Sequence, residues 1–286
     1  MAEIGFENGV ARSLVPYPDN EWNTWNASAS PQDHFVCVQS IYVDGENAFW
    51  ILDPANPMFS GVVQGGAKLL KLDLQTNRVI QTFLFDSLVA PAASYLNDIR
   101  VDTEHDVAYV TDSGLGAIIV VDLRTGVSRR VLYDHSSTKA ERVVLTIDGR
   151  GWANVVHSDG LALRPDGTYL YYQALRGRTL YRIGTDRLRD TSLTQSQLGA
   201  YVERVGETGA ADGIAFAPDG NLYLTAIEHN EVRRMTPGGE VQTVVADTGL
   251  KWPDSFSVTP DNTIYVTTSR IGFSLGVHLL FKIINP

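Results

Sequence analysis

The sequence has few of the residues that would place the protein in several common classes. Among 286 residues there is one cysteine, Cys37, so an intramolecular disulfide is excluded. Nowhere does an apolar run reach the roughly 18 residues of a membrane-spanning helix. Basic residues are also scarce, with 23 Lys and Arg against 33 Asp and Glu and a net charge of −10. This balance argues against a nucleic-acid partner, whose phosphates require a basic face.

The chain has the bulk composition of a globular protein and no sign of a division into domains. Hydrophobic residues make up 44% and charged residues 20% of the sequence, which is ordinary for a packed core. There is no Pro/Ser-rich linker or low-complexity stretch at which to cut the chain. We therefore predict a single domain over residues 1–286.

A short sequence motif that occurs five times is the most informative feature of the sequence. Each copy has an amide or a carboxylate in second place, continues with alternating apolar residues and soon meets a β-rich run such as Tyr223-Leu224-Thr225. Strand-built self-similarity at a spacing of roughly 40 to 60 residues predicts a β-propeller. The second positions are Gln39, Asn97, Asp159, Asp212 and Asp254.

The two ends of the chain depart from this repeat. Ala2–Phe6 and Val10–Val15 resemble two outer strands without an inner pair before them. Five copies plus this half-blade predict an all-β, six-bladed β-propeller whose first blade is incomplete at the N-terminus. Because a cut blade leaves unpaired strand edges, we expect some tens of residues upstream, and with them any secretion signal. The last copy supplies three strands, the third over residues 277–284.

Three long loops interrupt the repeats. They cover residues 54–67, 134–157 and 185–198, and the last of these predicts a short helix near Thr191–Leu198. Loops of this length are often functional in a compact fold, although propeller faces also carry variable loops without a function.

The stretches Ser94–Asp98, Ala108–Gly114 and Tyr171–Ile183 resemble the yellow/major royal jelly protein family in its microbial form. Together with weaker matches, the resemblance covers residues 15 to 270 and implies a six-bladed propeller. The family includes pigmentation proteins, nutritive secreted proteins and binders of small amines or sterols, and a dopachrome-tautomerase activity is often ascribed to it by similarity. The resemblance implies no catalytic motif that transfers residue by residue.

A more distant similarity is to propellers of the gluconolactonase/regucalcin type. These enzymes hold one divalent metal with a Glu, two Asn and an Asp from inner strands. By blade order the resemblance implies that Asn97 matches the first Asn, Asp159 replaces the second and Asp212 matches the Asp, while the Glu would lie in the incomplete first blade. The extra carboxylate suits Ca²⁺, which prefers several oxygen ligands.

The five second positions predict a ring of oxygens, since the inner strands of a propeller line its central channel. Three carboxylates within about 6 Å cannot all stay ionised without a cation; otherwise one pKa must rise. A bound metal would resolve this conflict and permit metal-assisted hydrolysis or isomerisation. In the alternative interpretation, Asp-Gly at the start of a strand is turn chemistry with solvated carboxylates.

These considerations define a candidate site and a function. We predict a small-molecule-binding protein, with hydrolysis or isomerisation of a lactone or cyclic carbonyl compound as its activity if it is an enzyme. The other hypothesis is a non-catalytic secreted binding or structural protein without metal chemistry. The candidate catalytic residues are Asp212, Asp159 and His157, the ligand-binding residues are Gln39, Asp254 and Trp252, and the metal ligands are Asn97, Asp159 and Asp212.

Overall fold

The structure, a computed structural model, describes residues 1–269, 271 and 279–283. The chain forms two compact units. Unit 1 consists of residues 1–108 with 121–129, and unit 2 of residues 109–120 with 130–286. The grouping of all residues into a single domain stays a prediction.

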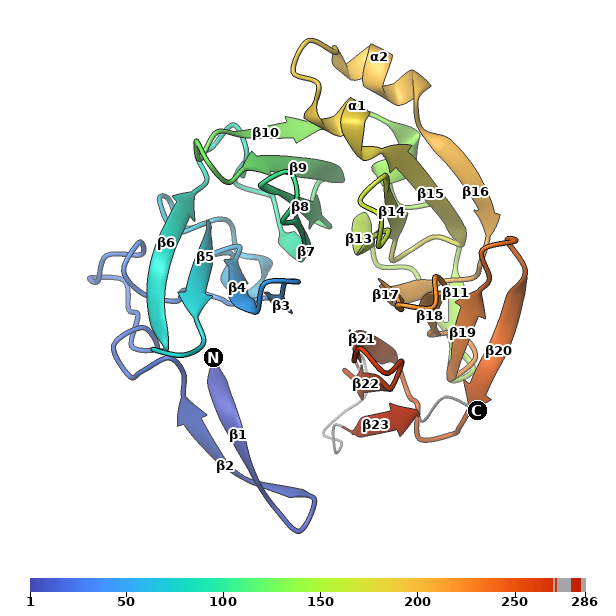
Figure 1. Cartoon of the computed structure of the whole chain (residues 1–286), viewed down its shortest axis with the longest axis horizontal. Coiled ribbons are helices and arrows are strands. Elements are labelled where there is room, and N and C mark those ends of the chain that lie inside the picture. The colour runs from blue at the N-terminus through green and yellow to red at the C-terminus, as the bar shows by residue number, and fades with distance from the viewer. Residues whose placement is uncertain (270, 272–278, 284–286) are drawn as a thin grey trace. The chain divides into compact units, whose positions relative to one another are not determined.

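Five antiparallel sheets carry the chain-ordered strands of propeller blades (Figure 1). Consecutive strands are neighbours in each sheet, so each blade is an antiparallel meander along the chain. The all-β propeller class predicted from the repeat is therefore confirmed. The strands are β3 (Ser40–Val43), β4 (Ala48–Asp53), β5 (Lys68–Asp73) and β6 (Arg78–Leu84); β7 (Leu96–Asp102), β8 (Val107–Asp112), β9 (Ala117–Asp122) and β10 (Ser128–Val131); β13 (Ser158–Leu163), β14 (Tyr169–Ala174), β15 (Thr179–Gly184) and β16 (Glu203–Glu207); β17 (Ala211–Phe216), β18 (Leu222–Ala226), β19 (Glu231–Met235) and β20 (Val241–Ala246); and β21 (Pro253–Val258), β22 (Ile264–Thr268) and β23 (Leu280–Ile283).

The prediction of six blades was wrong, because the described residues form five blade sheets. β1 (Ala2–Glu7) and β2 (Val10–Pro16), interpreted above as half of an incomplete blade, form a two-stranded sheet of their own. Nearly all of their side chains are exposed, so this hairpin buries no face as a blade does against its neighbour. The sequence could not reveal this, since an isolated hairpin and the outer half of a blade share the same alternation of apolar residues.

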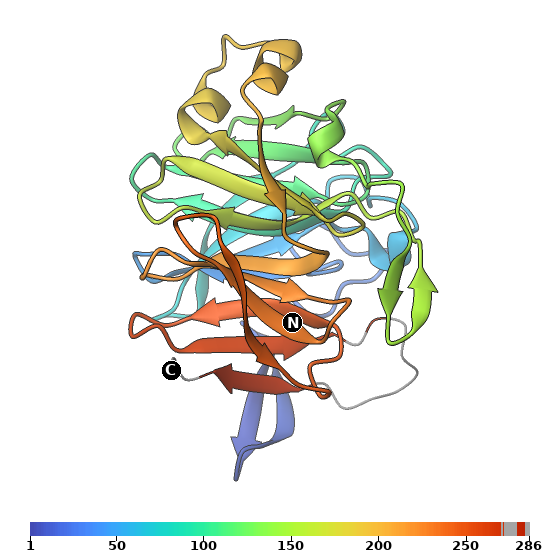
Figure 2. The same ribbon diagram turned by 90° about the vertical axis from the view of Figure 1, so that its right-hand side faces the viewer.

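The last blade has the three strands that the sequence predicts, β21 to β23. Within the predicted third strand, residues 277, 278 and 284 lie outside the described residues. Of the helices among those described, α1 (Thr185–Arg189) and α2 (Gln195–Ala200), neither has the length or apolar character to cross a membrane. The single helix expected near Thr191–Leu198 is thus replaced by a pair, which protrudes from the blades of unit 2 (Figure 2).

The turns marked by Pro-Asp in the sequence form as expected. Gly167 has a φ of 70° and donates its N–H to the Arg164 carbonyl at 2.8 Å, and Asn262 has a φ of 62° and donates to the Thr259 carbonyl at 2.9 Å. Gly and Asn are the residues that reach this left-handed region at least cost. The hairpin chemistry inferred from the sequence therefore sets where the first strand of a blade ends.

Apolar side chains hold neighbouring blades of unit 2 face to face. Leu180 of β15 and Leu222 and Leu224 of β18 are buried in one cluster, which also contains Ile214 of β17. Burial of one such side chain contributes about 1.5–3 kcal/mol. The second strand is enclosed on both sides: every residue of β18 is buried. This packing presses the first strands of successive blades together.

Backbone contact between the first strands of unit 2 depends on glycine. A Cβ built on Gly160 of β13 would lie 2.6 Å from the Asp212 carbonyl oxygen of β17. One built on Gly213 of β17 would lie 1.9 Å from the Asp254 carbonyl oxygen of β21. Both distances are far inside van der Waals contact, so only glycine allows β13, β17 and β21 to approach in this way.

Gly213→Ala is expected to destabilise the protein by about 3 kcal/mol, because a methyl group would be forced against the backbone of β21. The measurement is the urea midpoint and slope of the purified variant. Gly206→Ala is the matched control, since a Cβ at Gly206 in β16 meets nothing within 4 Å, and it should change the free energy of unfolding by less than about 1 kcal/mol. Equal midpoints for the two variants would contradict the close approach.

Candidate functional site

The five polar positions of the repeat take matching places in the blades. Asn97, Asp159, Asp212 and Asp254 are each the second residue of the first strand of a blade, namely β7, β13, β17 and β21. Gln39 comes immediately before β3. The structural equivalence inferred from the repeat is thus confirmed. Gln39 and Asn97 belong to unit 1, and the three aspartates belong to unit 2.

In unit 1 the two amides are joined directly. The Gln39 Nε2–H donates to Asn97 Oδ1 at 2.6 Å, and the Tyr95 hydroxyl donates to Gln39 Oε1 at 2.6 Å. Asn97 is only 8% exposed, whereas Gln39 is exposed. The sequence predicted Asn97 as a metal ligand and Gln39 as a ligand-binding residue. The structure joins these two side chains by a direct hydrogen bond between neutral amides.

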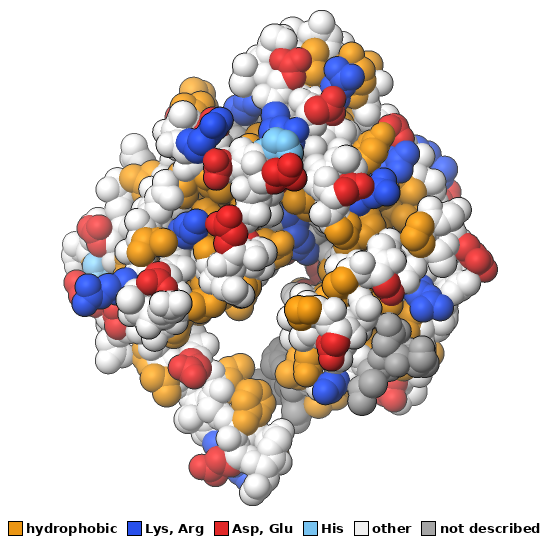
Figure 3. Space-filling view, in the orientation of Figure 1, with side chains coloured by type: hydrophobic (Ala, Val, Ile, Leu, Met, Phe, Trp, Pro, Cys, Tyr) orange, Lys and Arg blue, Asp and Glu red, His pale blue; other side chains and the backbone are white. Residues whose placement is uncertain are grey.

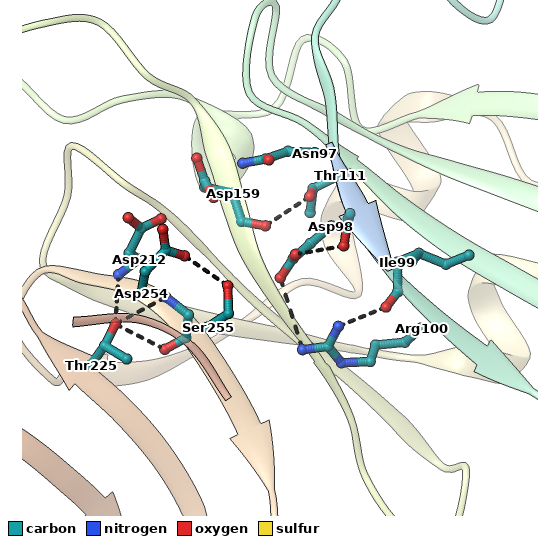
Figure 4. Close-up of polar contacts among 12 residues, drawn as sticks. Asn97, Asp98, Ile99, Arg100, Thr111, Asp159, Asp212, Thr225, Asp254 and Ser255 are labelled. Atoms are coloured by element: carbon teal, nitrogen blue, oxygen red, sulfur yellow. Dashed lines mark hydrogen bonds and ion pairs between the residues drawn. The ribbon is translucent and has the colours of Figure 1, made fainter. Parts of the chain in front are cut away.

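In unit 2 the carboxylates occupy β-bulges rather than turns. The registers of β13, β17 and β21 with their partner strands each shift across the aspartate and the residue that follows it. In β17 the Thr225 hydroxyl accepts the N–H groups of Asp212 at 3.1 Å and of Gly213 at 2.9 Å, because the bulge removes them from the strand ladder (Figure 4). The simple alternative of turn chemistry therefore does not describe Asp159 or Asp212, which lie inside a strand.

Asp212 is held by a buried tryptophan. The Trp252 indole N–H donates to Asp212 Oδ2 at 2.6 Å, and the ring is 1% exposed. Trp252 has a φ of 51°, a left-handed conformation that is costly for a bulky residue. The sequence predicted Trp252 as the wall of a ligand pocket; the structure shows a buried side chain whose polar atom positions a candidate catalytic carboxylate.

Asp254 differs electrostatically from an ordinary surface aspartate. Burial raises the pKa of its carboxyl group, and the Ser255 hydroxyl, which donates to Oδ1 at 2.9 Å, opposes that rise. Asp212 and Asp254, both labelled in Figure 4, lie on β17 and β21, which are in contact. Asp159 and Asp212 are 5% and 8% exposed. Asp159 and Asp212 are therefore largely withdrawn from water, while Asp254 is partly exposed.

His157, a candidate base, is tied to the insertion that precedes β13. Its Nδ1 accepts the Ala140 N–H at 2.9 Å, so Nε2 carries the proton in the neutral ring. Burial lowers the pKa of His157, and the positive charge of Lys139 lowers it further. In this neutral ring Nδ1 is used as an acceptor and Nε2 carries the hydrogen, so the bonds of His157 fit a structural role, and the ring has no free lone pair with which to act as the predicted base.

The insertion over residues 134–157 packs against the strands that carry the carboxylates. It contains η2 (Ser136–Thr138) and the hairpin of β11 (Leu145–Ile147) and β12 (Arg150–Trp152), the yellow-green pair at the side of Figure 2. Leu145 and Ile147 share a buried cluster with Trp252, whose ring meets Trp152 edge-on at 5.4 Å. The long loop singled out in the sequence thus supports the residue that holds Asp212.

Charged contacts fix this hairpin in place. The Glu228 carboxylate accepts the Thr146 N–H at 2.8 Å and forms a two-pronged pair with the Arg178 guanidinium at 2.8 and 2.7 Å. At the hairpin tip, Lys251 Nζ lies 2.6 Å from Asp148 Oδ2. Bidentate pairs of this kind are stronger and more directional than simple ion pairs.

The predicted metal site was compared with the donor groups that the structure provides. Among residues 1–269, 271 and 279–283, no three His, Cys, Asp or Glu side chains group closely enough to hold a metal ion. Of the three predicted ligands, Asp159 and Asp212 share unit 2, while Asn97 belongs to unit 1. One oxygen of Asp212 is already engaged by Trp252. Ca²⁺ also accepts amide and backbone carbonyl oxygens, so the predicted set of Asn97, Asp159 and Asp212 stays a prediction.

The Gly-rich loop over residues 54–67 is held firmly in unit 1. Asn56 is 2% exposed and donates through Nδ2 to the Ser94 carbonyl at 2.8 Å, while its Oδ1 accepts the Gly61 N–H at 2.8 Å. Met58 and Phe59 have positive φ values of 55° and 56°. Each such residue costs about 1–3 kcal/mol, so the surrounding contacts hold the loop in this conformation.

Sequence reasoning missed the threonine that supports the bulge. Thr225 follows the tyrosine of β18 by two residues, and the same Tyr-x-Thr spacing occurs at Thr111 of β8 and Thr267 of β22. The Thr267 hydroxyl accepts the Ser255 N–H at 3.3 Å, and the Thr111 hydroxyl donates to the Asp159 carbonyl at 2.7 Å. The recurrence of Tyr-x-Thr was the available signal.

Asp254→Asn is expected to stabilise the protein at neutral pH. A raised carboxyl pKa means that the folded state binds more protons than the unfolded state, whose Asp titrates near about 3.9, so stability falls as pH rises above that value. Asparagine does not ionise and escapes this loss. The advantage of the variant should vanish below about pH 4 and grow by about 1.4 kcal/mol per pH unit until the raised pKa is reached. Urea unfolding between acidic and neutral pH measures it.

Asp261→Asn is the control with the opposite sign. The exposed Asp261 carboxylate accepts hydrogen bonds from the Thr259 hydroxyl and from the Thr263 N–H, and these lower its pKa. Its stabilising contribution is therefore present at neutral pH and lost as pH falls through the lowered pKa, so Asp261→Asn should cost stability where Asp254→Asn adds it. A destabilised Asp254→Asn would show that the carboxylate is paired with a positive group.

Comparison with known proteins agrees with the resemblance inferred from the sequence. Residues 36–285 match the profile of the family described as "Major royal jelly protein". Major royal jelly protein 1 of Apis mellifera is 24% identical over 205 residues, covering 65% of this chain and 44% of that protein. The 6-deoxy-6-sulfogluconolactonase of Pseudomonas putida is 30% identical over 119 residues, covering 41% of this chain and 40% of that protein.

The chain thus spans about two fifths of the length of these relatives. Among solved structures, a gluconolactonase from Xanthomonas campestris superposes with a TM-score of 0.53 at 14% identity, covering 83% of this chain and 71% of that one. A likeness at this identity concerns the fold alone. The profile match extends over most of the sequence, from before the first blade through the last described strand, and on that ground the chain belongs to the major royal jelly protein family.

Proposed function

We propose that the protein binds a small molecule through Asp159, Asp212 and Asp254, and that this molecule carries a positive charge. The observation that supports the proposal most directly is the raised pKa of Asp254, caused by burial. A carboxyl group in such a place resists ionisation, and a cation nearby reverses this tendency. A bound cation would therefore stabilise the ionised Asp254 carboxylate, and this gain would contribute to the binding free energy.

The surroundings of the three carboxylates favour a ligand over solvent. Asp159 and Asp212 retain only 5% and 8% exposure, so a charge bound there interacts through a medium less polar than water. On the face seen in Figure 3, acidic and basic side chains are interspersed rather than gathered by sign. Asp159, Asp212 and Asp254 stand at matching positions of β13, β17 and β21.

We assign no step to Ca²⁺, although the sequence and the gluconolactonase resemblance predicted it. The described residues do not gather three His, Cys, Asp or Glu side chains around one point, and the Trp252 indole already donates to Asp212. An organic ammonium group needs fewer oxygens than Ca²⁺, which takes six to eight. A cationic organic ligand is therefore the better match to the donors present.

Cyclohexylamine and its neutral analogue cyclohexanol test the proposal. At 100 times its dissociation constant a ligand adds about 2.7 kcal/mol of stability, which raises the melting temperature by about 5 °C in a chain of this size. We expect this rise with cyclohexylamine at pH 7, a smaller one with cyclohexanol, and a loss of at least half of the amine effect in Asp254→Asn.

Glu240→Gln serves as the matched control, because it removes one negative charge from an exposed turn. It should keep the full amine effect. Parallel melts in CaCl₂ and in EDTA examine the metal prediction: a rise with Ca²⁺ that Asp212→Asn abolishes would replace the organic cation by the metal. An amine effect of the same size in Asp254→Asn would contradict the proposed site.

Hydrolysis of a lactone is the second candidate, favoured by the similarity to the Pseudomonas putida lactonase. Asp159 or Asp212 would accept a proton from a water molecule while the oxygen of that water attacks the lactone carbonyl carbon. The ring C–O bond would break, and the departing ring oxygen would take the proton that Asp254 retains because burial raises its pKa. The two proton transfers balance and need no metal.

Hydrolysis of glucono-δ-lactone in a pH-stat tests this second function. The catalysed rate above the spontaneous rate should fall as pH rises through the raised pKa of Asp254, since the acid must be protonated. Asp254→Asn should lose about 100-fold or more, the usual contribution of a general acid, while Glu240→Gln should match the parent protein. A rate equal to the spontaneous one for the parent protein would rule out this substrate chemistry.

A further inference from the structure

The turn that joins β1 to β2 carries the single Asn-Gly pair of the sequence, Asn8-Gly9. Both residues have left-handed backbone conformations, with φ values of 52° and 75°, as the central pair of a tight hairpin turn requires. Both are exposed, and a Cβ built on Gly9 would meet nothing within 4 Å. Water therefore reaches the Asn8 side-chain amide and the Gly9 backbone alike.

An asparagine side chain that is followed by glycine can react with the backbone of its own chain. The Gly9 nitrogen bonds to Asn8 Cγ and loses its proton, while Nδ2 takes up a proton and leaves as ammonia, so that a five-membered succinimide ring forms. Water then adds to one of the two ring carbonyls and breaks the bond of that carbonyl to the ring nitrogen, which yields aspartate or isoaspartate. Glycine favours the first step, because no Cβ hinders the approach of its nitrogen.

The attacking nitrogen is not engaged in this turn. The Gly9 N–H has no hydrogen-bond acceptor among the residues that the structure describes. Asn47, in the turn between β3 and β4, is also left-handed, with a φ of 60°. There the next N–H, that of Ala48, donates to Asp44 Oδ1 at 2.9 Å. The nitrogen that would attack Asn47 is therefore held by a carboxylate, whereas the one beside Asn8 is not.

Asn262, in the turn between β21 and β22, gives a second comparison. Its φ is 62°, and the next N–H, that of Thr263, donates to Asp261 Oδ1 at 3.2 Å. Thr263 also carries a branched side chain where Gly9 has none. The left-handed conformation alone is thus common to these turns, and the glycine with its unengaged nitrogen distinguishes the turn at Asn8.

The tight turn must open before the Gly9 nitrogen can reach Asn8 Cγ, and the hairpin offers little resistance to opening. Nearly all side chains of β1 and β2 are exposed. A two-stranded hairpin without a buried face is marginally stable in water, so its local opening costs little free energy. Asn47 differs in this respect too, because the strand that follows it, β4, is largely buried.

We propose that Asn8 is a site of spontaneous deamidation, with water as the reagent and isoaspartate and aspartate as the products. Either product adds a negative charge at the turn, next to Glu7. Isoaspartate also inserts a methylene group into the backbone, which disturbs the pairing of β1 with β2, since register depends on the spacing of residues along each strand. The site uses no residue of unit 2 and does not depend on the ligand proposed for the three aspartates.

Peptide mapping by mass spectrometry tests the proposal on the folded protein, incubated at neutral pH and physiological temperature. The conversion of amide to acid is followed at Asn8, Asn47 and Asn262 in the same sample. We expect Asn8 to convert at least about tenfold faster than the other two, and unfolding in urea to raise its rate by less than about tenfold, because local opening of the hairpin costs little. Isoaspartate is measured by methyl transfer from S-adenosylmethionine, catalysed by an isoaspartyl methyltransferase.

Gly9→Ala should slow the conversion of Asn8 about tenfold, because the added Cβ hinders the attacking nitrogen. Gly45→Ala is the matched control: it changes another glycine at which a Cβ would meet nothing within 4 Å, and it should leave the Asn8 rate unchanged. Far-UV circular dichroism and the melting temperature verify that both variants fold.

Three results would overturn the proposal. Asn8 could convert no faster than Asn47 and Asn262, or it could yield aspartate without isoaspartate, which would show direct hydrolysis rather than ring formation. An Asn8 rate that is the same in Gly9→Ala as in the parent protein would likewise exclude attack by the Gly9 nitrogen.

Discussion

The contact on which the candidate site depends is backbone against backbone. Gly160 and Gly213 let β13, β17 and β21 approach until the carbonyl oxygens of Asp212 and Asp254 fill the space where side chains would stand. Each glycine directly follows an aspartate of the row. The same dipeptide therefore provides both the polar group and the absence of a Cβ, and the carboxylates are brought together by the packing that closes blade on blade.

This packing places acidic side chains where water is largely excluded, which carries an electrostatic cost. The indole N–H of Trp252 offsets part of that cost by its hydrogen bond to Asp212. The hairpin of β11 and β12 keeps the indole buried. The Asp254 carboxylate accepts a hydrogen bond from the Ser255 hydroxyl, yet burial still raises the pKa of Asp254. A carboxyl group whose pKa is raised in this way lowers the stability of the folded state at neutral pH.

The two units carry different chemical groups at the equivalent second positions of the repeat. In unit 1 the second positions are neutral amides, and Gln39, Asn97 and Tyr95 satisfy one another in a chain of hydrogen bonds. In unit 2 they are acids, which cannot satisfy one another without a proton or a cation. Repetition of a strand thus sets the place of a side chain, while the residue found there decides whether that place carries a neutral amide or an acid.

The amino-acid sequence determined by itself what depends on local periodicity: the all-β propeller class, the turns at Gly167 and Asn262, and the equivalence of the second positions. It could not determine the number of blades, because the hairpin of β1 and β2 has the alternation of a blade without burying a face. Nor could it assign Trp252, whose partner Asp212 lies 40 residues away, or Phe59, whose exposure depends on a loop held by Asn56. These features were decided by the tertiary structure, since hydrogen bonds and burial between distant segments leave no periodic trace in the chain.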